Sequence, residues 1–185
     1  MENNRFDQAM SRVTAGDVSG LEEIYRAYAS SVYAVCLSVT GKPADAEDAA
    51  VETFIRIWQK AGTYRSGAEH RAWLMTIAHR TAAEIMRRQN RISPVEDAVL
   101  EILPSRERLE DEACTRLLLQ RSLEQLSEAE RQVVSLHLIA DLTLRETARV
   151  LNEPLGTVAW RKRQAIGKLR RMMMEREEMD YETTV

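Results

Sequence analysis

The sequence has few of the residues that break helices and few of those that build β-sheets. Its 185 residues include only 7 glycines and 4 prolines, and aromatic residues make up 5% of the chain. A loop-rich β protein uses more glycine and proline, and a β-sandwich depends on aromatic and β-branched strands. With 44% hydrophobic residues the chain is also too apolar to be disordered. The composition therefore favours a helical protein, and the length allows one medium domain or two small ones.

Long apolar runs and clustered metal ligands are missing as well. No uncharged stretch reaches the roughly 18 apolar residues that a membrane span needs, and the N-terminus lacks a signal peptide's basic start and apolar core. The two cysteines, Cys36 and Cys114, lie far apart in apolar surroundings, which favours reduced thiols over a disulfide. Neither stands at zinc-ligand spacing from His70, His79 or His137. We expect a cytoplasmic protein with no membrane span, no metal and no cofactor.

The net charge of −3 hides two basic segments separated by an acidic one. Arg71–Arg91 holds five arginines against one acid, and Thr157–Arg171 holds six basic residues and no acid. Between them, Ile92–Glu112 holds seven acids against two arginines. Two basic patches around an acidic segment are typical of a chain that contacts DNA at two places. Because non-specific affinity comes mainly from neutralising phosphates, the negative net charge predicts weak DNA binding by the protein alone.

Helix start and stop signals recur along the chain. Four Ser or Thr residues are followed three residues later by Glu, the spacing of a capping box; they are Ser19, Ser66, Ser127 and Thr143. Helix ends are marked by Gly16, Gly41, Gly62 and the Ser93–Pro94 step. These signals predict helices near residues 4–14, 20–40, 44–60, 67–90, 106–125, 128–140, 144–151 and 156–176. No segment alternates like a strand, so the predicted fold class is all-α.

The third predicted helix begins with acids and continues with apolar residues. Val51, Ile55 and Trp58 share one face by their spacing, which we interpret as a core-facing stripe. The acids, Asp45 and Asp48 among them, have a purely structural interpretation, because carboxylates in a first turn stabilise a helix through its dipole.

The fourth predicted helix combines an apolar face with a basic one. The apolar face holds Trp73, Leu74, Ile77, Ala78, Thr81 and Ile85. The basic face holds Arg80, Arg87 and Arg91 around Glu84, with Arg88 beside them. One interpretation is a solvated face on which Glu84 pairs with Arg80 and Arg87. The other is phosphate binding, since the stripe is net positive.

Residues 142–171 have the pattern of a helix-turn-helix. A short helix, with Ala148 on its apolar side, is followed by a turn at residues 152–156 and a longer arginine-rich helix from Thr157. Small Ala148 allows the two helices to approach closely, and Val158 packs the second against the first. In this motif the second helix enters the major groove and presents its early residues to base edges. A generic helical hairpin is the alternative.

Taken together, the two halves resemble a small bacterial sigma factor of the extracytoplasmic-function type, over nearly the whole chain. Residues 45–58 are similar to the family's helix that binds core RNA polymerase, and residues 70–91 to its promoter-melting, −10-reading segment. Residues 126–134 and 154–161 are similar to its −35-reading domain.

The resemblance implies two small helical domains joined by a flexible acidic linker. Residues 1–91 would form the region 2 domain, 92–112 the linker and 113–185 the region 4 domain, with no fixed separation of the basic patches without polymerase. A relaxed coil of about 20 residues spans only about 25 Å, less than one DNA turn of about 34–36 Å. The family holds its linker extended in a polymerase channel, where the acidic residues mimic nucleic acid. The acidic residues of this chain are also consistent with a linker that is simply solvated.

The resemblance also implies the site residues. Polymerase binding would use Asp45, Asp48, Glu52, Ile55 and Trp58. The −10 element would be opened and read by Arg65, His70, Trp73, Arg80, Arg87, Arg88 and Arg91, the loop at residues 65–70 holding an extruded base. The −35 element would be read by Thr157, Trp160, Arg161, Lys162, Arg163 and Gln164, although Trp160 has an alternative interpretation as a core residue.

Four positions depart from the family's pattern. Asn152 and Glu153 stand where a Gly and an aliphatic residue are usual, and Asn tolerates the left-handed conformation that the turn requires. Lys162 replaces a packed Leu or Tyr, and Arg80 replaces an Asn of the −10-reading helix. The docking of the last helix then relies on Val158, Ile166 and Leu169.

The implied function is promoter-specific transcription initiation. The expected partners are core RNA polymerase, through its β′ clamp helices and β flap, promoter DNA and an anti-sigma factor, with no small-molecule substrate. We expect no enzyme, because the sequence holds no nucleophile–base arrangement and no glycine-rich phosphate loop. Two other classes remain: an autonomous helix-turn-helix repressor, which binds DNA without polymerase, and a protein-only adaptor, which leaves both arginine patches unexplained.

Overall fold

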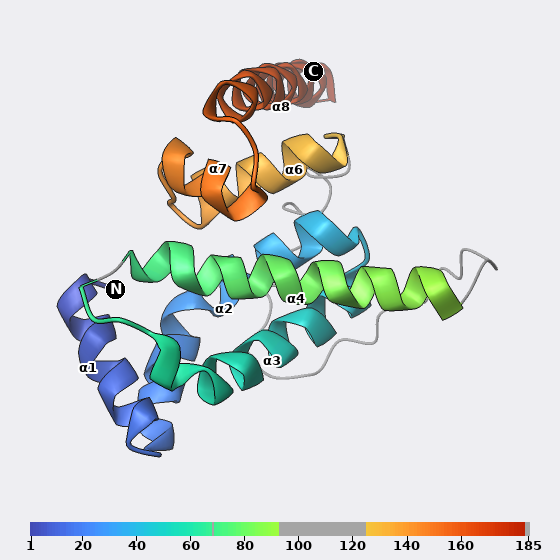
Figure 1. Ribbon diagram of the computed structural model, residues 1–185. Coiled ribbons are helices and arrows are strands. Elements are labelled where there is room, and N and C mark those ends of the chain that lie inside the picture. The colour runs from blue at the N-terminus through green and yellow to red at the C-terminus, as the bar shows by residue number, and fades with distance from the viewer. Residues whose placement is uncertain (68, 93–124, 184–185) are drawn as a thin grey trace.

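The computed structural model describes residues 1–67, 69–92 and 125–183 (Figure 1), and every regular element within these ranges is helical. The N-terminal elements are α1 (Asn3–Thr14), α2 (Val18–Thr40), α3 (Pro43–Gln59), the short η1 (Ala61–Thr63) and α4 (His70–Ile92). The C-terminal elements are α6 (Glu128–Val134), η2 (Ser135–Ile139), α7 (Leu144–Leu151) and α8 (Leu155–Thr183). The all-α prediction is confirmed. The helix predicted near 106–125 and most of the predicted linker lie outside the described residues.

Two of the four predicted capping boxes form, both in the C-terminal domain. The Ser127 hydroxyl accepts from the backbone N–H of Glu130 at 3.4 Å, and the Glu130 carboxylate accepts from the Ser127 N–H at 2.8 Å. Thr143 and Glu146 make the same pair of bonds at 3.2 and 2.7 Å. Each box satisfies two backbone donors at a helix start, where they have no partner within the helix.

The other two predicted boxes are wrong. The N-cap of α2 is Asp17, whose carboxylate accepts from the Ser19 N–H at 2.9 Å, so the helix begins before Ser19. Ser66 lies outside α4, which begins at His70, and its hydroxyl donates to Asp7 of α1 instead. Asp caps a helix as well as Ser does, so the spacing of Ser and Glu does not choose between neighbouring candidates.

Helix ends follow the predicted signals with two exceptions. Gly41 ends α2 and Asn152 ends α7, both in the left-handed region with φ of +68° and +54°. Gly62 instead lies inside η1. The turn after Asn152 is also shorter than predicted, because α8 already begins at Leu155.

The buried face of α3 differs from the predicted core stripe. Val51 is 62% exposed and Ile55 is 46% exposed, while Trp58 is half-buried. The helix buries Ala46, Ala49, Thr53, Phe54 and Ile57 instead. Small alanines let α3 lie close to its neighbours, and apolar spacing alone could not indicate that they form the inner face.

The two halves of the chain lie against each other (Figure 1). Helix α2 packs against α6 and η2, and α4 packs against α7. Leu136 and Leu142 of the C-terminal half belong to the same buried cluster as Ile24 and Leu74 of the N-terminal half. The two domains are therefore in contact in this structure, because apolar side chains from both are buried together. None of the described helices is long and apolar enough to cross a membrane.

Gly20 marks the closest approach of α1 to α2. A Cβ at this position would lie 2.4 Å from the Ala9 carbonyl oxygen and 3.0 Å from Val13 Cγ2. The variant Gly20→Ala should therefore lower the free energy of unfolding by about 1–3 kcal/mol. The matched variant Gly167→Ala, in α8 with no atom within 4 Å, should raise it by about 0.5–1 kcal/mol. Urea unfolding followed by circular dichroism measures both, and equal stability of the two variants would contradict this packing.

Candidate functional site

The outer face of α3 carries apolar residues where a solvent-facing helix normally has polar ones. Asp48, Val51 and Ile55 follow at i, i+3 and i+7, and all three are exposed. Of the other predicted polymerase-binding residues, Asp45 and Trp58 are half-buried beside this face. An exposed apolar surface with an acidic rim is typical of a protein–protein contact.

The apolar surface of α3 continues onto α2. A groove of about 220 Å³ is lined by Val18, Leu21, Tyr25 and Phe54, with Glu22 and Arg26 at its rim. The Tyr25 ring meets Phe54 edge-on at 4.9 Å between ring centroids. The sequence pattern gave no indication of the α2 side of this surface, because Val18 and Tyr25 have core-like spacing and only their exposure in the structure distinguishes them from core residues.

Arg56 connects α3 to α4 and changes the predicted charge pairing. Its guanidinium donates to Glu52 at 2.8 Å and to Glu84 at 2.7 Å. The Arg56 bond holds the pKa of Glu84 below its ordinary value. The expected pairs of Glu84 with Arg80 and Arg87 do not form among the described residues, because α3 supplies a better-placed arginine.

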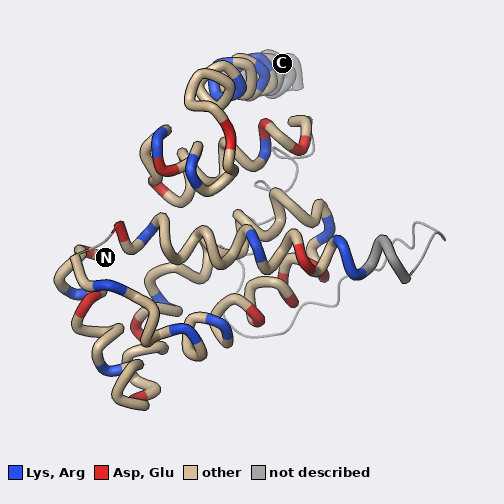
Figure 2. The backbone as a smooth tube through the Cα atoms, viewed as in Figure 1, with Lys and Arg blue, Asp and Glu red and all other residues tan. Residues whose placement is uncertain are grey.

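Basic residues recur along α4, as the blue segments of this helix in Figure 2 show. Arg80 and Arg87, seven residues apart and therefore on one face, are exposed, and Arg88 is exposed beside them. Arg91 lies in the same helix, and its side chain is outside the described residues. The α4 face can accept phosphates without first breaking a described ion pair.

The loop before α4 is exposed, whereas the ring of His70, the first residue of α4, is buried. Arg65 is exposed, and Trp73 is half-buried with its ring 5.1 Å from that of Tyr64. His70 is only 3% exposed, stacks on Phe6 at 4.5 Å and lies 2.7 Å from the Tyr28 hydroxyl through Nε2. The expected contact of His70 with an extruded base is therefore not supported. Burial lowers its pKa and keeps the ring neutral in an aromatic core.

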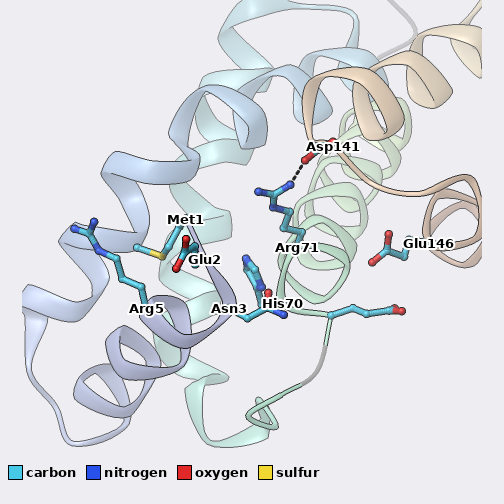
Figure 3. A pocket seen from close by; sticks show the side chains of 9 residues that line it. Met1, Glu2, Asn3, Arg5, His70, Arg71, Asp141 and Glu146 are labelled. Atoms are coloured by element: carbon cyan, nitrogen blue, oxygen red, sulfur yellow. Dashed lines mark hydrogen bonds and ion pairs between the residues drawn. The ribbon is translucent and has the colours of Figure 1, made fainter.

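A cleft of about 910 Å³ lies where α1, the start of α4 and the C-terminal domain meet (Figure 3). Arg71 reaches across it to Asp141, and Glu69 pairs with Arg149 at its edge. The lining residues are Met1, Glu2, Asn3, Arg5, Glu69, His70, Arg71, Asp141 and Glu146. Four carboxylates against two arginines make the cleft acidic, so it does not suit a nucleic acid.

The helix-turn-helix forms as the sequence predicts. Val133 of α6, Ala148 of α7 and Val158 of α8 make a small buried cluster, flanked by Leu144 and Leu151. The docking residue that the sequence analysis missed is Ala165, which is fully buried, whereas Ile166 and Leu169 are only half-buried.

The outer face of α8 brings together three of the predicted −35 residues. Trp160 is 54% exposed, so its interpretation as a core residue is wrong, and Arg163 and Gln164 are exposed beside it. Arg161 is instead held in an ion pair with Glu153. This pair explains how the turn accommodates Glu153, since the carboxylate stays partly exposed and paired. Thr157 and Lys162 are half-buried at the sides of the helix.

Comparison with known proteins identifies sigma-factor regions in both halves of the chain. Family models match Sigma-70 region 2 at residues 24–92 and Sigma-70 region 4 at residues 122–171, well over half of the chain together. The chain is 26% identical over 177 residues to the ECF RNA polymerase sigma factor BldN of Streptomyces coelicolor, covering 93% of this chain and 67% of BldN. It is also 26% identical over 179 residues to the ECF sigma factor SigK of Mycobacterium tuberculosis, covering 89% of this chain and 91% of SigK.

The chain belongs to the extracytoplasmic-function sigma factors. It therefore binds core RNA polymerase and directs promoter-specific transcription initiation, as sigma factors do. Sigma factors are in general non-catalytic DNA-binding factors. The family prediction made from the sequence is confirmed.

Two solved structures share the fold of this sigma factor. One is CnrH in complex with the cytosolic domain of CnrY, with a TM-score of 0.63, 19% identity and coverage of 94% of this chain and 99% of that one. The other is RpoE in complex with the anti-sigma factor NepR from Bartonella quintana, with a TM-score of 0.62, 19% identity and coverage of 83% and 96%. Both likenesses support the two-domain helical fold.

Proposed function

We propose that three separate outward-facing surfaces divide the work of initiation in this sigma factor. The outer face of α3 docks on core polymerase, α4 with the loop before it opens and reads the −10 element, and α8 reads the −35 element. The observation that carries this assignment is that the outer faces of α3, α4 and α8 are exposed, while the inner faces of the same helices are buried in the core.

The polymerase contact rests on the chemistry of α3. Val51 and Ile55 leave a large apolar area in water, and a partner that covers them recovers about 25 cal/mol per Å² buried. Asp48 on the same face favours a basic partner. We propose that the β′ clamp helices cover this face, and that the groove beside Tyr25 belongs to the same contact.

The first functional prediction is that Asp48→Lys combined with Ile55→Ser weakens binding to core polymerase about tenfold or more, because it removes an apolar contact and reverses a rim charge. Both positions are exposed, so helicity and thermal stability should stay at wild-type values. Glu52 is left unchanged, since it supports Arg56. The conservative pair Asp48→Glu with Ile55→Val should bind normally. Fluorescence titration with core polymerase measures the affinity, and wild-type affinity of the first variant would refute the contact.

The −10 contact rests on the exposed arginines of α4, Arg80, Arg87 and Arg88. We propose that Arg80, Arg87 and Arg88 bind the phosphates of the strand that is separated there, with Arg91 continuing the stripe. Arg65 and the half-buried Trp73 lie at the start of this helix, where an extruded base would need stacking and basic contacts.

The second functional prediction concerns promoter opening. Arg80→Ala combined with Arg87→Ala should reduce melting at the −10 element at least fivefold in the holoenzyme, because two phosphate contacts are lost. The control, Lys42→Ala with Lys60→Ala, removes the same charge from exposed positions elsewhere in the N-terminal domain and should melt DNA normally. Permanganate footprinting measures the opening, and similar footprints from both double variants would reject the role of α4.

The −35 contact rests on the outer face of α8. Arg can pair with guanine O6 and N7, and Gln with adenine, each pair contributing about 1–3 kcal/mol of discrimination. We propose that Arg163 and Gln164 read bases and that Trp160 supplies apolar contact beside them. Arg161 and Lys162 lie at the sides of the helix, where positive charge positions the protein without specifying sequence.

The third functional prediction separates reading from positioning. Arg163→Ala should relax the preference at one −35 position, whereas Arg170→Ala should lower activity on all promoters about equally, because a phosphate contact is blind to sequence. Both arginines are exposed on α8, so neither change should unfold the domain. Transcription from a library of −35 variants measures the ranking. The same ranking for Arg163→Ala and the wild type would show that this residue does not read bases.

The packed arrangement of the two domains bears on the free protein. Two promoter elements lie more than one DNA turn of about 34–36 Å apart, and we propose that α7 leaves α4 when both are read. We therefore propose that the free protein binds promoters poorly and that core polymerase separates its domains. Nucleotidyl transfer belongs to the polymerase, and we place the protein with the chromosome in the cytoplasm. By analogy with RpoE bound to NepR, we propose that an anti-sigma factor covers these surfaces.

A further inference from the structure

Asp7 of α1 lies against a loop that is almost sixty residues away in the sequence. Its carboxylate accepts three hydrogen bonds from the segment Tyr64–Gly67. The Tyr64 hydroxyl donates to Oδ1 at 2.6 Å. The Ser66 hydroxyl and the Gly67 N–H donate to Oδ2 at 2.6 and 3.1 Å. One side chain thus collects two side-chain donors and one backbone donor of the loop.

The chemistry of this contact suits a fixed anchor. The bonds from Ser66 and Tyr64 outweigh desolvation and hold the pKa of Asp7 below its ordinary value, so the group is a carboxylate at neutral pH. Hydrogen bonds to a charged acceptor are shorter and stronger than neutral ones. Gly67 has a φ of +76°, which a side chain would strain. The loop therefore takes a particular shape, and Asp7 bonds to the glycine that adopts the left-handed conformation.

The residue before Asp7, Phe6, contacts the same loop through its ring. Phe6 is fully buried, meets Tyr64 edge-on at 5.3 Å and stacks on His70 at 4.5 Å between ring centroids. Tyr64 begins the exposed loop and His70 begins α4. Helix α1 therefore contacts both ends of the segment that leads into the −10-reading helix.

We propose that Asp7 is a positioning residue for −10 recognition: it holds the loop Tyr64–Gly67 in the shape in which Arg65 meets the promoter. This inference rests on the proposed function, in which the loop and α4 contact the −10 element. The match to Sigma-70 region 2 begins at residue 24, so it assigns nothing to α1.

The test uses holoenzyme assembled from core polymerase and the full chain, with one library of −10 variants on a promoter of constant −35 sequence and one library of −35 variants on a promoter of constant −10 sequence. Asp7→Ala should reduce the discrimination among −10 sequences about fivefold to tenfold, because three hydrogen bonds to one carboxylate are lost. The ranking of −35 variants should not change. Asp7→Asn, which keeps one acceptor oxygen, should lose less.

The matched control is Asp17→Ala, which removes an acid that caps α2 and makes no contact with the loop. It should lower the melting temperature and leave the −10 ranking unchanged. Ser66→Ala removes a single donor from the loop side, so Asp7→Ala combined with Ser66→Ala should cost less discrimination than the sum of the single changes.

Three outcomes would overturn the inference. An unchanged −10 ranking for Asp7→Ala, when Arg65→Ala alters it, would show that the loop reads DNA without this anchor and would leave the proposed function intact. If Asp7→Ala reduced the discrimination among −10 variants and among −35 variants equally, Asp7 would have a general structural role instead. An unchanged −10 ranking for Arg65→Ala as well would reject the loop as a −10 contact, and the inference about Asp7 with it.

Discussion

The C-terminal half of α2 is buried on every side, and the arrangement of the other helices follows from this. All seven residues from Ala34 to Thr40 are buried. A helix that is apolar all round is stable only when each of its faces is covered. Helices α1, α3 and α4 cover part of α2, and α6 with η2 cover more of it. Burial of the apolar surface of α2 therefore drives both the folding of the N-terminal domain and the docking of the C-terminal domain. The helices of the N-terminal domain alone leave part of this surface uncovered.

This constraint determines which surfaces remain for partners. The apolar contact dominates the docking, since the ion pairs Arg71–Asp141 and Arg149–Glu69 are exposed, and such pairs contribute about 0–1 kcal/mol each. The docked domain covers the side of α4 that holds His79, whose ring lies 3.4 Å from Gln132 of α6. Arg80, Arg87 and Arg88 lie outside this contact and remain exposed, as do the outer faces of α3 and α8. Packing and function thus use different faces of the same helices.

Charged side chains join the helices that carry these surfaces to neighbouring helices. Arg56 of α3 pairs with Glu52 of the same helix and with Glu84 of α4, so an ion pair joins the helix of the proposed polymerase surface to the helix of the proposed −10 surface. In the C-terminal domain Glu130 is buried, but bonds from Lys168 and Ser127 outweigh the burial and keep its pKa below the ordinary value. The capping box of α6 is thereby tied to α8. Each proposed contact surface is thus mounted on two helices.

The sequence by itself determined the features that depend on a few neighbouring residues. The helical class, the caps at Ser127 and Thr143, the left-handed turn at Asn152 and the helix-turn-helix could all be predicted, because each arises from backbone bonds within one or two turns. The family resemblance extended this to the order of the two domains. Helical spacing placed the arginines of α4 on one side as a candidate phosphate-binding face, whereas the Trp160 face of α8 was predicted from the family resemblance.

Only the tertiary structure decided which apolar face is inside and which charged group finds which partner. Val51 and Ile55 have the spacing of a core stripe, yet α3 turns its alanines inward because they permit closer packing. His70 looked like a loop residue and lies in an aromatic core, while Glu84 pairs with an arginine from another helix. Asp7 carried no signal at all, because its three partners are nearly sixty residues away. Contacts between residues so far apart in the sequence depend on how the helices cross. The periodicity of apolar residues within one helix does not indicate how that helix packs against another.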